Sequence, residues 1–125
     1  MARILIIEDI KLNIELFTAL LSYAGHETFV AECALPGIEL AQTKSPDVIL
    51  MDIQMIGMDG IQATQILRAD PKTQNIPIAA VTALAMDGDR EKLLSSGFDA
   101  YIPKPIDTDQ FVKDVNKLIE LGRLR

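Results

Sequence analysis

The chain has 125 residues, of which 49% are hydrophobic, and this fits one globular domain with a substantial core. Its net charge of −6 argues against nucleic acid and anionic membranes as partners, because both attract clusters of lysine and arginine. The single cysteine, Cys33, excludes an internal disulfide and fits a reducing cytoplasm. We expect one domain over residues 1–125, with no output domain, signal peptide or membrane span.

Apolar residues alternate between strand and helix periodicity along the chain. Buried runs predict strands at residues 3–8, 27–31, 48–51, 76–81 and 100–102. Helical spacing predicts helices at residues 10–24, 35–43, 59–68, 87–96 and 107–121. Gly25 is typical of a helix end, and we expect His26 after it to be a solvated loop residue. Asp107 or Thr108 is the expected N-cap of the last helix. This alternation predicts an α/β fold, an open parallel sheet with helices on both faces.

Polar residues stand where four of these strands end. Glu8 and Asp9 end the first strand, and Asp52 ends the third. Thr82 follows the fourth strand and Lys104 follows the fifth. Ligands of such sheets bind outside the carboxyl ends of the strands, so we expect these side chains to share one pocket. A lone aspartate at a strand end is usually a turn residue, and it is the convergence of the others that favours a functional site.

The predicted pocket has the chemistry of a metal and phosphoryl site. Two like charges about 4 Å apart repel by roughly 4 kcal/mol at an effective dielectric constant near 20, and a cation would offset this repulsion. A few carboxylates with water are ligands that Mg²⁺ prefers. Lys104 adds a positive charge and Thr82 a hydroxyl donor, so a transferred phosphoryl group would be stabilised beside an aspartate able to accept it.

At these residues the sequence resembles the receiver domain of two-component response regulators, most of all single-domain receivers of the cell-cycle type. The resemblance covers essentially the whole chain and implies a flavodoxin-like (βα)5 doubly wound sheet in the order 2-1-3-4-5. One departure is Ile56, where the family often has proline after the preceding methionine. The matching motifs are IIED, VILMDIQM, MDG, VTALA and GFDAYIPKP.

The resemblance implies a role for each residue of the pocket. Asp52 would accept a phosphoryl group from phosphohistidine on a sensor histidine kinase or a histidine phosphotransfer protein. Asp9, Asp52 and the backbone carbonyl of Gln54 would bind Mg²⁺ directly, and Glu8 would act mainly through water. Lys104 would pair first with Asp52 and then with the phosphoryl oxygens. The bond between Lys104 and the proline after it would be cis.

The resemblance also implies a switch and two partner surfaces. Thr82 would move toward the phosphoryl group, and Tyr101 would turn into the space that Thr82 leaves, although half-buried packing alone is the other interpretation of Tyr101. An effector would bind the face of helix 87–96, strand 100–102 and helix 107–121, where a phosphorylated receiver could also dimerise. Helix 10–24 is apolar nearly all round, which favours a second partner. The expected phosphodonor contacts are Ile10, Leu12, Asn13 and Leu16, with simple burial as the alternative for the last.

Two other functions stay open on the sequence alone. Phosphatases of the haloacid-dehalogenase type also use a strand-end aspartate with Mg²⁺, threonine and lysine, but they resemble each other in a second aspartate two residues later. This chain has Gln54 there, which cannot act as an acid. A flavodoxin-like cofactor binder needs backbone donors after its first strand, where Glu8 and Asp9 would repel a phosphate. A phosphoacceptor module that catalyses only its own phosphotransfer and dephosphorylation is therefore favoured over a classical enzyme.

Overall fold

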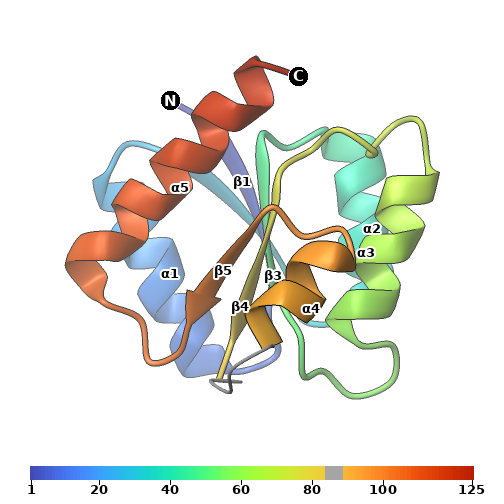
Figure 1. Ribbon diagram of the computed structural model, residues 1–125. Coiled ribbons are helices and arrows are strands. Elements are labelled where there is room, and N and C mark those ends of the chain that lie inside the picture. Colours follow the sequence, from blue (N-terminus) through green and yellow to red (C-terminus); the bar gives the residue numbers. More distant parts are fainter. Residues whose placement is uncertain (84–88) are drawn as a thin grey trace.

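The computed structural model describes residues 1–83 and 89–125. Strands and helices alternate along these residues, and Figure 1 shows a central sheet with α1 and α5 on one side and α2, α3 and α4 on the other. The elements are β1 (Arg3–Ile7), α1 (Lys11–Tyr23), β2 (Glu27–Ala31), α2 (Ala34–Lys44), β3 (Val48–Asp52), α3 (Gly60–Ala69), β4 (Ile78–Thr82), α4 (Asp89–Ser95), β5 (Ala100–Pro103) and α5 (Thr108–Arg123).

The sheet is parallel throughout, in the order β2-β1-β3-β4-β5. The predicted α/β fold and its strand order are therefore confirmed. The chain first adds β2 on one side of β1 and then β3 on the other, so the strand order reverses between β1 and β3. Ile7 of β1 lies opposite Met51 of β3, so the residues that follow them, Glu8 and Asp52, lie side by side where the two strands end.

Both faces of the sheet are covered by apolar side chains, as the continuous runs of the central strands require. Every residue of β3 and β4 is buried. On the α1 and α5 side, Phe17 and Phe111 stack with their ring centroids 5.1 Å apart. On the opposite side, Ile38 of α2 and Leu67 of α3 belong to the second core cluster. Among the described residues no helix is both long and apolar enough to cross a membrane.

Most predicted element ends differ from the observed ones by one or two residues, and some of these differences arise because capping residues lie just outside the helices. Asp59 is the N-cap of α3, and its carboxylate accepts a hydrogen bond from the N–H of Gln62 at 2.8 Å. Asp107, one of the two expected candidates, caps α5. The predicted helix 87–96 corresponds to α4, and its residues 87 and 88 lie outside the described part of the chain.

His26 differs from the expected solvated loop residue, because it is half-buried and hydrogen-bonded on both ring nitrogens. Its Nδ1 accepts a hydrogen bond from the N–H of Ala2 at 3.1 Å. The other ring nitrogen, Nε2, lies 3.2 Å from Oδ1 of Asn116, and it carries the proton when Nδ1 is an acceptor in the neutral ring. The imidazole therefore joins the start of β1 to α5.

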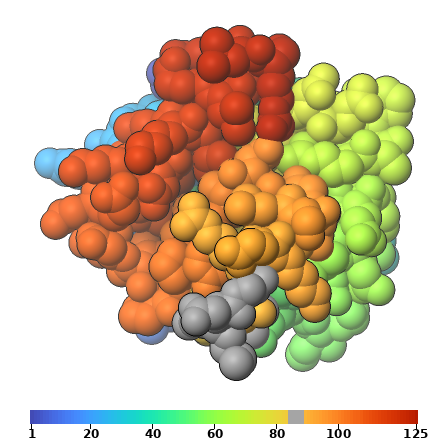
Figure 2. Space-filling view, in the orientation of Figure 1, coloured from blue at the N-terminus to red at the C-terminus, as the bar shows by residue number. Residues whose placement is uncertain are grey.

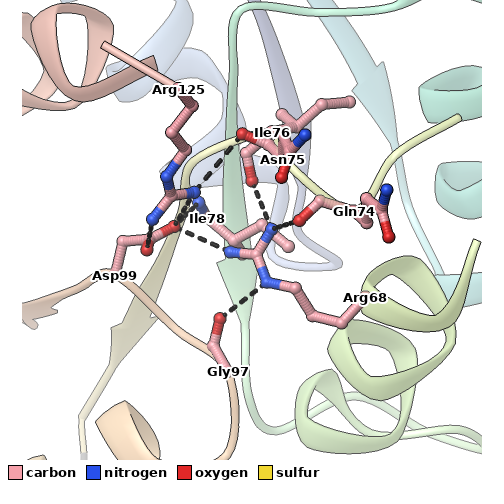
Figure 3. A network of polar contacts seen from close by, with 8 residues as sticks. All are labelled: Arg68, Gln74, Asn75, Ile76, Ile78, Gly97, Asp99 and Arg125. Carbon is pink, nitrogen blue, oxygen red and sulfur yellow. Dashed lines mark hydrogen bonds and ion pairs between the residues drawn. The ribbon is translucent and has the colours of Figure 1, made fainter. Parts of the chain in front are cut away.

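A polar network joins the loops at the amino ends of β4 and β5, at the edge of the sheet opposite the strand ends predicted to form the pocket (Figure 3). The carboxylate of Asp99 pairs with Arg68 at 2.7 Å, contacts Arg125, and accepts the N–H of Ile78 at 2.9 Å. The guanidinium of Arg68 also donates to the backbone carbonyl oxygens of Gln74, Ile76 and Gly97. These contacts satisfy carbonyl groups that the loops would otherwise leave without a partner.

Candidate functional site

Three carboxylates lie together where β1 and β3 end. Glu8 and Asp9 directly follow β1, and Asp52 is the last residue of β3. One oxygen from each of these carboxylates lies within 4.8 Å of the others. Glu8 is only 1% exposed and Asp52 only 3%, whereas Asp9 is exposed. The structure therefore brings the predicted acidic residues into one pocket, with two of them buried and one facing solvent.

Lys104 supplies the positive charge of this pocket. Its Nζ lies 2.8 Å from Oε1 of Glu8 and 3.5 Å from Oδ1 of Asp52. The lysine follows β5, and the Lys104–Pro105 bond is cis, as the resemblance implied. The predicted pairing with Asp52 is present, but the shorter contact is to Glu8.

Asp52 carries a strongly perturbed carboxyl group. Burial and, to a smaller extent, the nearby Glu8 raise its pKa, which is about 7. The ammonium of Lys104 and the N–H of Gln54, which donates to Oδ1 of Asp52 at 3.1 Å, act in the opposite direction. A buried carboxylate of this kind is stabilised as an anion when a cation binds beside it.

Glu8 shows the opposite balance. Burial acts to raise its pKa, but hydrogen bonds shared with Asp52, Lys104 and the N–H of Ile10 together lower it. Three carboxylates and one ammonium leave the pocket with an excess of negative charge. Oxygen ligands around such an excess fit a hard divalent cation such as Mg²⁺.

The predicted switch residues lie on neighbouring strands beside the pocket. Thr82 is the last residue of β4 and is 1% exposed. Tyr101 lies in β5 opposite Ala80 and packs, half-buried, against the core on the α2, α3 and α4 side. Because side chains alternate along a strand, Thr82 lies on the same face as Ala80 and hence as Tyr101. The side chains expected to move together therefore share one face of the sheet.

The pocket requires a glycine at position 60. The sequence motif MDG contains Gly60, but the sequence alone does not show why it is needed. It is the first residue of α3, and a Cβ atom placed there would collide with the backbone carbonyl oxygen of Asp52. The same atom would lie 3.0 Å from Cα of Ile53. Only glycine lets α3 approach the end of β3 this closely, so this residue helps to place Asp52.

Residues 4–116 match the response regulator receiver domain family. The chain belongs to this family. The polar-differentiation response regulator DivK of Brucella ovis is 39% identical to it over 116 residues, which is 93% of this chain and 94% of that relative. The match agrees with the predicted resemblance to single-domain receivers of the cell-cycle type. These relatives give no support to the phosphatase alternative.

Solved receivers have the same fold. The receiver domain of a sensor histidine kinase from Pseudomonas aeruginosa, which has a magnesium ion coordinated in its active site cleft, is 30% identical. It superposes with a TM-score of 0.87 and covers 95% of this chain and 98% of its own. The receiver domain of the Francisella response regulator 1452 is 29% identical, with a TM-score of 0.90 and full coverage of both chains.

The expected phosphodonor contacts of this receiver are accessible on α1 and just before it. Leu12 is 73% exposed, Ile10 50% and Leu16 39%, whereas Asn13 is half-buried. A small hollow of about 100 Å³ separates Asn13 and Leu16 from the loop after β5, and Lys104 forms part of its wall. The apolar surface of α1 therefore adjoins the acidic pocket, and Leu16 is exposed rather than buried.

The receiver's other predicted surface is the face formed by α4, β5 and α5. Figure 2 shows α4 and α5 on the same face of the molecule. A groove of about 310 Å³ lies there, with Leu94, Tyr101 and Leu118 as apolar lining and Arg90 and Lys117 as basic lining. The partly buried Tyr101 thus lies both in this groove and on the sheet face that Thr82 shares.

Proposed function

We propose that this receiver accepts a phosphoryl group on Asp52. The observation that carries the proposal is the position of this carboxylate, which is buried at the end of β3, 3.5 Å from the Lys104 ammonium and within 4.8 Å of two other carboxylates. A strand-end aspartate with these neighbours has the environment of a covalent phosphoacceptor. Family membership independently supports a role in two-component signalling.

The transfer would proceed by attack of an Asp52 oxygen on the phosphorus of a phosphohistidine. A new P–O bond gives an acyl phosphate, the P–N bond breaks, and the imidazole nitrogen of the donor keeps the electron pair. Lys104 would move from the carboxylates toward the phosphoryl oxygens and offset their charge. A pKa of about 7 means that a metal-free Asp52 is partly protonated at neutral pH, so a nearby cation also improves the nucleophile.

Mg²⁺ is the metal that the donor set of the pocket fits. Asp9, Asp52 and the backbone carbonyl of Gln54 would hold it, with Glu8 acting through water. When bound, it would neutralise charge on the transferring phosphoryl group. The magnesium ion in the Pseudomonas receiver supports this assignment. Asp9 is the exposed member of the three carboxylates, which leaves it accessible to an incoming hydrated ion.

The signal would then pass through Thr82 and Tyr101 to the face of α4, β5 and α5. Thr82 would hydrogen-bond the phosphoryl group, and Tyr101 would turn inward on the sheet face that both share. The effector, or a second phosphorylated copy, would bind at that face. The phosphodonor, a histidine kinase or a histidine phosphotransfer protein, would dock on the apolar surface of α1. We place this module in the cytoplasm.

The experiment that tests the phosphoacceptor is intact-mass spectrometry after incubation with acetyl phosphate and Mg²⁺. We expect one phosphate adduct on the wild type, no adduct on Asp52→Asn, and no adduct when EDTA removes the metal. Asp109→Asn is the matched control, because this exposed aspartate at the start of α5 lies outside the pocket and should leave labelling unchanged. An adduct that persists in Asp52→Asn would assign the acceptor to another residue.

A further inference from the structure

A groove of about 410 Å³, which we call the amino-end groove, lies at the opposite ends of the strands from the acidic pocket. Its walls come from the segments just before β1, β3 and β4 and from the C-terminal turns of α5, at the end of the molecule where Figure 1 marks both chain ends. Ligand sites in proteins commonly have volumes of about 300–1,000 Å³. The phosphoacceptor site and its two partner surfaces leave this groove unused.

The floor of the amino-end groove is apolar and closely packed. Ala2, Pro77 and Ile119 form part of it, and all three are buried. At Gly122, α5 lies so close to this floor that an added Cβ atom would be 3.0 Å from Cγ of Pro77. Ile76, which is half-buried, adds an accessible apolar side chain. The groove therefore offers an apolar surface against which a ligand can bury apolar side chains.

The loop that forms one wall of the groove is held in place by two arginine side chains (Figure 3). Arg68 donates to the carbonyl oxygens of Gln74 and Ile76 at 2.9 and 2.7 Å, and Arg125 donates to that of Asn75 at 3.3 Å. Three consecutive carbonyl groups of the loop are thus fixed by side chains from α3 and from the end of the chain. A wall that is already ordered loses little conformational entropy when a ligand binds.

The rim of the groove has more basic than acidic side chains, in contrast to the chain as a whole, whose net charge is −6. Lys72 in the loop and Arg123 in α5 are exposed, and Asp47 already accepts a hydrogen bond from the backbone N–H of Arg3 at 2.7 Å. Arg123 pairs with Glu120, but these side chains are 66% and 68% exposed, and an ion pair so exposed is readily exchanged for another. The rim therefore favours an acidic ligand.

We propose that the amino-end groove binds a short acidic peptide segment of a partner protein. An apolar side chain of the peptide would lie on the floor, and carboxylates beside it would pair with Lys72 and Arg123. Two basic side chains are too few to hold a nucleic acid or an anionic membrane on an acidic protein, whereas a peptide can use the apolar floor as well. The inference goes beyond the proposed function, because the groove and Asp52 lie at opposite ends of the strands. The peptide can therefore stay bound whether or not Asp52 is phosphorylated.

The first test is a selection of short random peptides displayed on phage against the immobilised full chain. The double variant Lys72→Ala and Arg123→Ala serves as the counter-selection. We expect the enriched peptides to carry aspartate or glutamate next to leucine, isoleucine or valine. The proposal is overturned if no peptide is enriched over the double variant, or if the enriched peptides are neutral or basic.

The second test locates the selected peptide by NMR titration of the isotope-labelled protein. The amide signals of Asn75, Ile76 and Ile119 should shift as the peptide binds. Shifts confined to Leu12 or Tyr101 would place the peptide on α1 or on the face of α4, β5 and α5, and would overturn the proposal.

The affinities of single variants test the charged rim. Lys72→Ala and Arg123→Ala should each weaken peptide binding roughly two- to fivefold, as expected for the loss of one exposed ion pair, and both effects should shrink at high salt. Lys113→Ala is the matched control, because this exposed lysine of α5 lies outside the groove and its loss should leave the affinity unchanged. An equal loss in Lys113→Ala would indicate unspecific attraction and contradict the proposal. The replaced side chains are exposed, so the variants should keep the wild-type circular dichroism spectrum.

The last measurement separates this proposal from the one for Asp52. Asp52→Asn, and the wild type incubated with acetyl phosphate and Mg²⁺, should both bind the selected peptide as tightly as the untreated wild type. Binding that weakens about tenfold in Asp52→Asn would overturn the proposal, because the peptide would then depend on the acidic pocket. If Asp52 proves not to be the acceptor, the peptide should still bind, so the two proposals can fail independently.

Discussion

Replacing Asp52 by asparagine should stabilise the metal-free protein at alkaline pH. The carboxyl group has a pKa of about 7 in the folded chain, against 3.8 for its ordinary value, because burial and the neighbouring Glu8 disfavour the anion. A group whose pKa is higher when folded favours folding in its protonated form. The contribution of Asp52 to the free energy of unfolding is therefore most favourable below the lower pKa. It falls as the pH rises between the two pKa values, and it stays at its lowest level above about pH 7.

The size of the effect follows from the difference between the two pKa values. A shift of about three units corresponds to roughly 4 kcal/mol at about pH 8, since one unit is worth about 1.4 kcal/mol. Asp52 is only 3% exposed, so screening by solvent reduces this free energy little. Because Asp52 and Glu8 interact, the destabilisation is shared between the two carboxyl groups. We expect Asp52→Asn to raise the free energy of unfolding by roughly 2–4 kcal/mol at about pH 8 and by much less at about pH 4.5.

Urea denaturation followed by circular dichroism, with EDTA present, measures this difference at each pH. Asp109→Asn is the control for the loss of an exposed aspartate. Saturating Mg²⁺ should stabilise the wild type, by about 2.7 kcal/mol at a hundred times its dissociation constant, and should stabilise Asp52→Asn much less. An equal gain in Asp52→Asn at both pH values would refute the reasoning, because it would mean that the cost does not arise from the ionised carboxylate.

Three other substitutions test the supports of the pocket and fold. Gly60→Ala should cost about 1–3 kcal/mol in urea denaturation and slow phosphorylation, because its Cβ collides with the carbonyl oxygen of Asp52. Arg68→Ala should cost about 1–3 kcal/mol, because Asp99 keeps Arg125 but loses Arg68, and the carbonyl oxygens of Gln74, Ile76 and Gly97 lose their donor. Mg²⁺ affinity by calorimetry should stay unchanged, because Arg68 lies at the opposite ends of the strands. Asp59→Ala should lower the thermal midpoint through the loss of about 1 kcal/mol of capping energy, and Asp59→Asn, which keeps an acceptor, should restore most of it.

The location of the pocket could be predicted from the sequence because it depends on topology. A parallel sheet brings the carboxyl ends of its strands to one edge, and the polar residues there are separated from the buried runs by sharp changes in hydrophobicity. The sequence alone therefore indicates Glu8, Asp52 and Thr82 as residues of the pocket. Helical periodicity likewise predicts the exposed apolar residues of α1, because that helix has more apolar positions than one buried face requires.

The contacts inside the pocket could not be predicted in the same way. The topology of the sheet predicts that Lys104 and the two buried carboxylates meet. The shorter distance from the lysine to Glu8 than to Asp52 depends on the turn after β1. The steric role of Gly60 depends on the approach of α3 to β3, which no local pattern contains. The expectation of a solvated His26 is wrong for a related reason, since its partner Asn116 is distant in the sequence.

The two edges of the sheet show why one is a candidate site and the other is structural. At the amino ends of the strands, Asp99 lies between two arginines, and the remaining guanidinium donors are used by backbone carbonyls. At the carboxyl ends, three carboxylates share one ammonium, so the fully ionised pocket has a charge of about −2 and Asp52 has a raised pKa. One divalent cation would balance that charge. The end with excess negative charge is therefore the candidate cation site, whereas the polar groups at the other end are paired with one another and hold the loops in place.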